Sequence, residues 1–369
     1  MASVWMAEPR RKIVYILGAG FSRPAHAPTQ GEILPAVLDQ EDNPELRNFL
    51  IHVFGHSKEL PLEDVFTALD KSISQNDVLG KFEMKEIIRA RECLNAGIIR
   101  LFNNRLHGRP DYVNQFADKI IDLRMKDKRA AKVSILSTNW DILLDNALGE
   151  KLESRHDCTE NGKRIAFVDY CTYTRQLLEH LDYIPPSNML RAAGLVNLKL
   201  LKLHGSFNWL MCPNCNSLFV MFGEKVADGP EGRICRVCTR NHSLDVQLRP
   251  ILITPTFVKD FSNVHFKQIW WNAGFELSEA THIVFIGYSL PLSDFELRYL
   301  FARNIDKKSK IKVVLWSKTG RATGEAAIAQ QRYRDFFGSR ILGSDEAFDF
   351  EGVKHYVDSL PNDTDGLFW

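Results

Sequence analysis

The stretch Lys12-Ile-Val-Tyr-Ile-Leu-Gly-Ala-Gly-Phe-Ser22 joins a short apolar run to two closely spaced glycines. The run from 12 to 17 is rich in β-branched residues and ends at Gly18, which is typical of a buried parallel strand that leads into a tight turn. Because Gly18 and Gly20 lack side chains, backbone N–H groups there can approach a phosphate at the start of the next helix. The motif predicts a phosphate-binding loop, although a plain strand-to-helix turn would explain the same glycines.

Five further apolar runs are predicted to be strands: residues 132–137, 196–203, 250–254, 282–286 and 311–316. Helical patterning separates most of them, and this alternation favours an α/β fold with a doubly wound, mostly parallel, Rossmann-like sheet. Residues 1–44 and 129–320 are assigned to this domain. Residues 45–128 carry charged, helix-period patterning and are predicted to be a helical insertion. Residues 321–369 are predicted to be a C-terminal helical extension, clearest from Glu325 to Phe337.

The bulk composition is that of a soluble globular protein. The 369 residues include 47 Lys and Arg against 46 Asp and Glu, a net charge of +1, so the overall charge does not indicate a nucleic-acid partner. No window approaches the ~20 apolar residues of a membrane span, and the first residues lack an apolar run of signal-peptide length. We expect a cytoplasmic protein with no membrane association.

Polar side chains follow three of the other predicted strands. They occur in Ser137-Thr-Asn-Trp-Asp141, in Lys202-Leu-His-Gly-Ser206, and in Gly287-Tyr-Ser-Leu-Pro-Leu-Ser-Asp294. The carboxyl ends of parallel strands meet at one edge of a sheet, where ligands bind in open α/β folds, so these clusters are candidates for one site. Structural roles remain open: Thr138 or Asn139 as a helix N-cap with Asp141 in the first turn, His204 as a hydrogen-bonded structural group, and Ser289 and Asp294 as turn and cap residues.

Four of the seven cysteines form two CxxC pairs, Cys212 with Cys215 and Cys235 with Cys238, separated by nineteen residues. This spacing predicts a structural zinc ribbon, placed at residues 208–245, in which the four thiolates close a tetrahedral site. A closed site has no position at which to activate water, so the zinc is expected to stabilise the module. His242 is a conceivable substitute ligand.

The order of these motifs resembles the sirtuin family: a glycine-alanine-glycine loop with a following serine, a threonine-x-asparagine-x-aspartate element, a histidine-glycine pair, four cysteines, and a late glycine-x-serine loop. The resemblance spans Gly18 to Ser289. It implies that NAD is the substrate, that Asn139 and His204 are catalytic, with His204 as the base, and that zinc is structural. The residues implied to bind the cofactor are Gly18, Ala19, Gly20, Phe21, Ser22, Asn139, Asp141, Gly287 and Ser289.

Two segments depart from the pattern of the protein-deacylating sirtuins. Residues 24–34 lack the aspartate-phenylalanine-arginine that follows the glycine loop in those enzymes. Residues 251–257 replace their phenylalanine-glycine-glutamate strand, and Pro255 removes a backbone donor that pairing with an acyl peptide would need. These departures resemble the divergent prokaryotic sirtuin-like branch of NAD-hydrolysing defence effectors, whereas the complete zinc ribbon is closer to the deacylases.

The sequence therefore predicts an NAD hydrolase that releases nicotinamide and ADP-ribose and depletes NAD in prokaryotic antiviral defence of the abortive-infection type. An NAD-dependent protein lysine deacylase and a non-catalytic module that binds NAD or ADP-ribose are the alternatives. Because a toxic hydrolase must be restrained, we expect a homo-oligomer and consider a separate activating or sensor protein, such as an ATPase. The insertion and the segment after Ser317 are the candidate contact surfaces.

Overall fold

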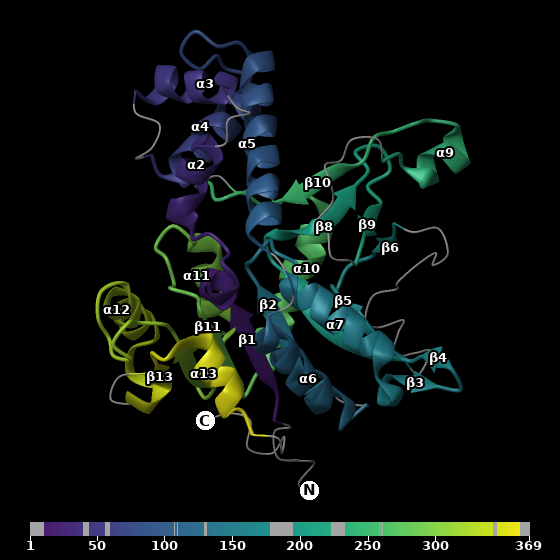
Figure 1. Ribbon diagram of the computed structural model, residues 1–369, viewed down its shortest axis with the longest axis vertical. Helices are drawn as coiled ribbons and strands as arrows, with labels where there is room; N and C mark the ends of the chain where they lie inside the picture. The colour runs from purple at the N-terminus through teal and green to yellow at the C-terminus, as the bar shows by residue number, and fades with distance from the viewer. Residues whose placement is uncertain are drawn as a thin grey trace, which may run out of the picture.

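The protein is described by a computed structural model that covers residues 11–39, 44–55, 60–106, 108, 110–128, 131–177, 195–222, 233–257, 259, 261–341 and 345–361. Its centre is a seven-stranded sheet in the order β13-β12-β11-β1-β2-β7-β5, in which every neighbouring pair is parallel (Figure 1). The strands are β1 Ile13–Leu17, β2 Val133–Ser137, β5 Ala166–Asp169, β7 Val196–Lys202, β11 His282–Ile286, β12 Lys310–Val314 and β13 Phe348–Asp349. This confirms the predicted α/β class.

Helices cover both faces of this sheet. One face carries α6 (Asp111–Met125), α7 (Leu143–Ser154) and α13 (Gly352–Ser359), and the other carries α10 (Val264–Ser278), α11 (Phe295–Asn304) and α12 (Glu325–Phe337). Aromatic rings fix each layer: Tyr15 of β1 meets Phe116 edge to face at 5.2 Å, and Phe285 of β11 meets Phe301 at 5.4 Å. Because β2 and β11 lie on opposite sides of β1, the strand order reverses next to β1, which is where doubly wound sheets bind ligands.

A separate helical module stands above the carboxyl ends of the strands (Figure 1). It consists of α2 (Gln30–Asp39), α3 (Pro44–Phe54), α4 (Leu62–Gln75) and α5 (Met84–Arg105). These helices share their own core, which includes the fully buried Phe66 and Leu94. Helix α6 also falls in the stretch predicted as an insertion, but it packs on the main sheet. Between 45 and 128 the described residues contain no strand, only an isolated bridge between Leu79 and Phe82.

A second sheet belongs to the cysteine-containing module, with the order β10-β8-β9-β6. Its strands are β6 (Arg175–Gln176), β8 (Gly205–Met211), β9 (Leu218–Val220) and β10 (Arg249–Leu252), and α9 (Arg236–His242) lies beside them. The strand predicted at 250–254 for the main sheet is therefore misplaced, since β10 pairs antiparallel with β8. An apolar run identifies a strand but carries no information about its partner.

Two strands of the main sheet were not predicted. β5 has four residues and β13 has two, too few to show a period in the sequence. β13 lies in the segment predicted to be only helical, and it extends the sheet beyond β12. A hairpin of β3 (Thr159–Glu160) and β4 (Lys163–Arg164) follows α7. None of the described helices has the length and apolar character to cross a membrane.

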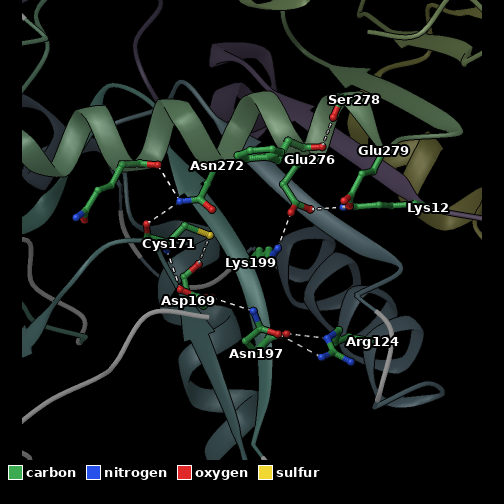
Figure 2. Close-up of polar contacts among 12 residues, drawn as sticks. Lys12, Arg124, Asp169, Cys171, Asn197, Lys199, Asn272, Glu276, Ser278 and Glu279 are labelled. Carbon is green, nitrogen blue, oxygen red and sulfur yellow. Dashed lines mark hydrogen bonds and ion pairs between the residues drawn. The ribbon is translucent and has the colours of Figure 1, made fainter. Parts of the chain in front are cut away.

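A buried carboxylate ties α10 to the sheet (Figure 2). Glu276 contacts Lys199 of β7 at 2.5 Å and Lys12, next to β1, at 3.0 Å, and only 3% of its side chain is exposed. Lys12 also pairs with Glu279 at the helix end, whose side chain is 64% exposed. Although burial alone would raise the pKa of Glu276, the two lysines hold it below its ordinary value. The ion pairs therefore clamp the helix across two strands.

Replacement of Glu276 by alanine should destabilise the fold by about 3–5 kcal/mol, because two mostly buried ammonium groups would lose their shared partner. The matched control is Glu279→Gln, which removes an exposed charge on the same helix and should cost less than about 1 kcal/mol. Urea unfolding followed by circular dichroism measures both. A loss of less than about 1 kcal/mol for Glu276→Ala, as small as that expected for Glu279→Gln, would show that the clamp is not a major source of stability.

Candidate functional site

A cleft of about 1000 Å³ of empty space, part of it open to solvent, lies where the carboxyl ends of the strands meet the helical module. Segments that follow β1, β2, β7, β10 and β11 line it together with residues of α2, α4 and α5. The lining includes Ala19, Ser22, Thr138, Asn139, Asp141, His204, Lys259, Gly287, Tyr288, Ser289 and Asp294. The polar clusters that follow four predicted strands thus share one cavity.

The floor of the cleft depends on the contact between two glycine loops. The N–H of Gly18 donates to the carbonyl of Ile286 at 3.0 Å, and that of Gly20 donates to the carbonyl of Gly287 at 2.8 Å. A Cβ on Gly20 would lie 2.6 Å from the Cα of Gly287. Gly287 itself has a φ of +62°, and a Cβ there would lie 2.3 Å from the carbonyl carbon of Gly20. Close loop packing therefore requires glycine at these positions.

Asn139 joins the loop after β2 to the loop after β1. Its Nδ2 donates to the carbonyl of Gly18 at 2.9 Å and to Oγ of Ser22 at 3.2 Å. Ser22 in turn donates to Oδ2 of Asp141 at 2.7 Å. Since its amide nitrogen is bound to protein, the side-chain carbonyl of Asn139 is the group left to accept a hydrogen bond from a ligand or water.

A buried lysine binds the main chain of Asp141. Lys202, at the end of β7, donates to the main-chain carbonyl of Asp141 at 2.6 Å and to Oδ2 of Asp145 at 3.1 Å. Both side chains of the Lys202–Asp145 pair are 1% exposed, and Tyr170 donates to the other oxygen of Asp145 at 2.7 Å. Burial raises the pKa of Asp141, although Lys202 opposes this. The pair fixes the loop that carries Asn139.

His204 follows β7 and presents an unpaired nitrogen. Its Nε2 is buried and has no hydrogen-bond partner among the described residues. Burial lowers the pKa of His204 to about 4, although Asp294 acts in the opposite direction. The imidazole is therefore neutral near pH 7. The next residue, Gly205, has a φ of +82°, and a Cβ there would lie 2.4 Å from the carbonyl oxygen of Ile251, which explains the histidine-glycine pair.

The structure decides between several of the roles left open by the sequence. Neither Thr138 nor Asn139 caps α7, whose N-cap position is Ile142, but Asp141 accepts from the N–H of Leu143 at 3.2 Å. Asp294 occupies the N-cap position of α11 without a side-chain cap bond. Its carboxylate is bound instead by Lys259 at 2.9 Å and by the hydroxyl of Tyr288 at 3.0 Å.

The residues implied to bind the cofactor do not all lie on the cleft surface. Gly18, Gly20 and Phe21 are not among the lining residues. The side chain of Phe21 packs in the main core against Tyr112 and Phe116. Lys259 and Tyr288 line the cleft but were not predicted as site residues. Tyr288 sits inside the late loop motif, which could have drawn attention to it, whereas no local pattern marks Lys259.

The segment after β10 closes one side of the cleft. Ile253 donates to the carbonyl of His204 at 2.9 Å and accepts from the indole of Trp140 at 3.2 Å. Two hydrogen bonds then join the segment to Thr67 of α4, one from the N–H of Phe257 at 2.9 Å and one with the hydroxyl of Thr256 at 3.1 Å. Several polar groups of this segment are thus bound by the chain itself.

The four cysteines of the two CxxC pairs form a zinc-binding cluster. Their sulfur atoms all lie within 4.8 Å of one another, with 3.6 Å between Cys212 and Cys238 and between Cys215 and Cys235. Tetrahedral Zn–S bonds of about 2.3 Å would place sulfurs roughly 3.8 Å apart, so the donor set fits the metal. His242 is exposed at the end of α9 and is not part of the cluster.

The fold is similar to those of solved Sir2 structures. A Sir2 homologue in complex with NAD shares 13% identity at a TM-score of 0.41, over 89% of this chain and 90% of that one. Sir2Tm bound to a propionylated peptide shares 13% at 0.38, over 88% and 93%. A structure from work on the mechanism and regulation of Sir2 enzymes shares 15% at 0.39, over 94% and 89%.

No protein-family model matches the chain, and no curated protein matches it. At such identities and TM-scores, the similarity to Sir2 structures does not assign a family or an activity.

Purified protein should contain one zinc ion per chain, and Cys238→Ser should lose it, because three thiolates cannot close the tetrahedral site. Cys93→Ser is the matched control, since Cys93 lies on α5 outside the cluster. Elemental analysis gives the metal content, and limited proteolysis reports whether the module opens while the main sheet stays folded. Retention of full zinc by Cys238→Ser would contradict this assignment of ligands.

Proposed function

We propose that this protein binds NAD in the cleft and hydrolyses its nicotinamide–ribose bond to give nicotinamide and ADP-ribose. The observation that carries the proposal is the unpaired, neutral Nε2 of His204 in the same cavity as Asn139. Bond cleavage builds positive charge on the ribose, which polar groups can stabilise. The carbonyl of Asn139 would orient water or a ribose hydroxyl, and His204 would accept the proton that it releases.

The phosphates of NAD would lie at the start of α1. The N–H groups of Gly18 and Gly20 already bond to protein carbonyls, so they support this loop rather than bind the ligand directly. Ala19 at the helix start and Ser289 line the cleft, whereas the hydroxyl of Ser22, which also belongs to the lining, already donates to Asp141. Backbone N–H and hydroxyl donors of this kind suit a dinucleotide without requiring a cationic side chain.

Water is favoured over an acyl-lysine peptide as the second substrate. An acyl peptide would bind as an added strand and needs free backbone groups on a strand edge. In this chain the segment after β10 bonds to His204, Trp140 and Thr67, and Pro255 has no N–H to offer. Those contacts favour the hydrolase over the deacylase, although a peptide that displaced the segment would restore the second possibility.

The cellular part of the proposal is NAD depletion during prokaryotic antiviral defence. It is supported by the sequence resemblance to NAD-hydrolysing effectors. It is also supported by the hydrogen bonds of the segment after β10, which occupy groups that an acyl peptide would need for pairing. A module that only binds NAD or ADP-ribose is the remaining alternative. The buried Nε2 of His204, which has no partner among the described residues, argues against that alternative, because an unsatisfied polar atom costs stability that simple binding would not require.

His204→Ala and Asn139→Ala should each lower the rate of nicotinamide release from NAD by about 10²–10⁴-fold, the usual contribution of a positioned general base or orienting group. His156→Ala, an exposed histidine outside the cleft, is the matched control and should keep wild-type activity. Chromatography of reactions with and without an acyl-lysine peptide provides the measurement. Turnover that requires the peptide would support the deacylase, and binding of NAD without turnover would support the regulatory module.

Self-association is the second part of the proposal, and it is supported by an aromatic surface on α10 and α11. Trp271 and Phe295 are 68% and 69% exposed, and together with Phe275 and Tyr299 they line an apolar groove between the two helices. Exposed apolar patches of this kind commonly mark interfaces. The surface lies outside the insertion and the C-terminal segment, where contacts were expected from the sequence.

Replacement of Trp271 by glutamate should shift the protein toward monomers, since the change places a charge in the centre of this surface. Light scattering after gel filtration gives the mass, and the exposed Ile328→Glu on α12 is a control of matched chemistry. If the wild-type protein is monomeric at every concentration, or if Trp271→Glu leaves an oligomer unchanged, this surface is not the interface.

A further inference from the structure

A cluster of charged groups is built around the buried Lys259, which lines the same cleft as His204 together with Asp294. Lys259 donates to Oδ1 of Asp294 at 2.9 Å and to Oε2 of Glu296 at 3.1 Å, and its side chain is only 2% exposed. The hydroxyl of Tyr288 donates to the other oxygen of Asp294 at 3.0 Å. Both oxygens of the Asp294 carboxylate are therefore held in place, by groups from two different segments.

The position of Asp294 in the helix does not account for this arrangement. An aspartate at an N-cap normally accepts a hydrogen bond from the first turn of its helix. Asp294 occupies the N-cap position of α11 but makes no such bond. Its carboxylate is instead directed to Lys259 and Tyr288, and all three residues line the cavity that contains His204.

The charges of the cluster suit a histidine that takes up a proton. One ammonium group and two carboxylates give a net charge of −1 while His204 is neutral. Proton uptake by His204 would bring the summed charge of the cluster and His204 to zero. A buried imidazolium without a counter-charge is costly, so a nearby net negative cluster lowers the free energy of the state that follows proton transfer.

We propose that Asp294, oriented by Lys259 and Tyr288, is a positioning residue that stabilises the protonated form of His204 during turnover. The proposal rests on the proposed function for its catalytic part, but the electrostatic coupling between the two side chains is independent of any substrate. Lys259 acts in the opposite sense, since its positive charge disfavours the imidazolium while its hydrogen bond orients the carboxylate.

The other groups around His204 are consistent with this assignment. Burial lowers the pKa of His204, Asp294 raises it, Lys259 lowers it, and the backbone hydrogen bond with Thr138 and then Glu296 raise it. Burial alone would raise the pKa of Asp294, yet His204 and Lys259 hold it below its ordinary value, so the carboxylate is ionised at neutral pH.

Two more carboxylates face the same cavity. Asp141 is bound by Ser22 and by the N–H of Leu143, and Glu63 lines the cleft from α4. Neither is among the groups that shift the pKa of His204. The carboxylate available to balance a charged His204 is therefore that of Asp294, with a smaller contribution from Glu296.

The test uses two substitutions with opposite expected effects on His204. Lys259→Met removes the positive charge and should raise the pKa of His204 by about one unit or more, which corresponds to a tenfold change in proton affinity. Asp294→Asn removes the counter-charge, so it should lower kcat for NAD hydrolysis at least about tenfold with little change in KM. Matched controls far from the cleft are the exposed Lys308→Met and Asp335→Asn, which should change neither quantity.

The pKa of His204 is measured on the full chain by NMR with ring-labelled histidine, using His204→Ala to assign the signal, and kcat and KM come from nicotinamide release. Melting curves confirm that each variant is folded. If Lys259→Met does not fold, Glu296→Gln replaces it, with an expected smaller fall in kcat than that of Asp294→Asn.

An unchanged His204 pKa in folded Lys259→Met would overturn the proposal, as would wild-type turnover by Asp294→Asn. If Glu296→Gln has to be used, a fall in kcat as large as that of Asp294→Asn would overturn it as well. Because the NMR titration needs no substrate, it separates this inference from the proposed function. A raised pKa in Lys259→Met together with no hydrolysis by the wild-type protein would support the electrostatic coupling of the Lys259–Asp294 cluster to His204 and contradict the hydrolase.

Discussion

The close contact between Gly20 and Gly287 is the constraint on which the site depends. It joins the loops after β1 and β11, the two strands between which the order of the main sheet reverses. A Cβ at either glycine would lie within 2.6 Å of backbone atoms in the other loop. The contact brings Ser289 and Asp294 to the same cavity as Asn139 and His204, so residues far apart in the sequence can act on one ligand.

Two buried lysines position polar groups of the cleft. Lys202 supports the loop that carries Asn139, through the main-chain carbonyl of Asp141, and Lys259 orients Asp294. Both are almost fully buried and paired with carboxylates, an arrangement that costs desolvation but fixes geometry. The unpaired Nε2 of His204 lies in the same cavity, and the helical module and the segment after β10 close the cavity's outer side. Asn139 and Asp294 are thus held by hydrogen bonds to the protein, while Nε2 of His204 has no partner among the described residues.

Much of this could be predicted from the sequence because the signals are local. Parallel strands appear in the sequence as apolar runs, and polar residues follow the carboxyl ends of these strands. The CxxC spacing identifies the zinc cluster. The sequence could not show which partner β10 takes, or that the two-residue β13 extends the main sheet, because pairing is set by tertiary packing. The glycines were expected for approach to a phosphate, whereas two of their N–H groups bind the neighbouring loop. Lys259 lies in no motif, and only the folded chain brings it to Asp294.

In the proposed reaction, water activated in this cleft accepts the ADP-ribosyl group of NAD. The most direct measurement is to incubate the protein with NAD in heavy-oxygen water, without acylated peptide, and to analyse the products by mass spectrometry. The expected products are nicotinamide and ADP-ribose that carries one heavy oxygen atom from the solvent. Release of nicotinamide only when an acyl-lysine peptide is added, with the acyl group transferred to ADP-ribose, would contradict it.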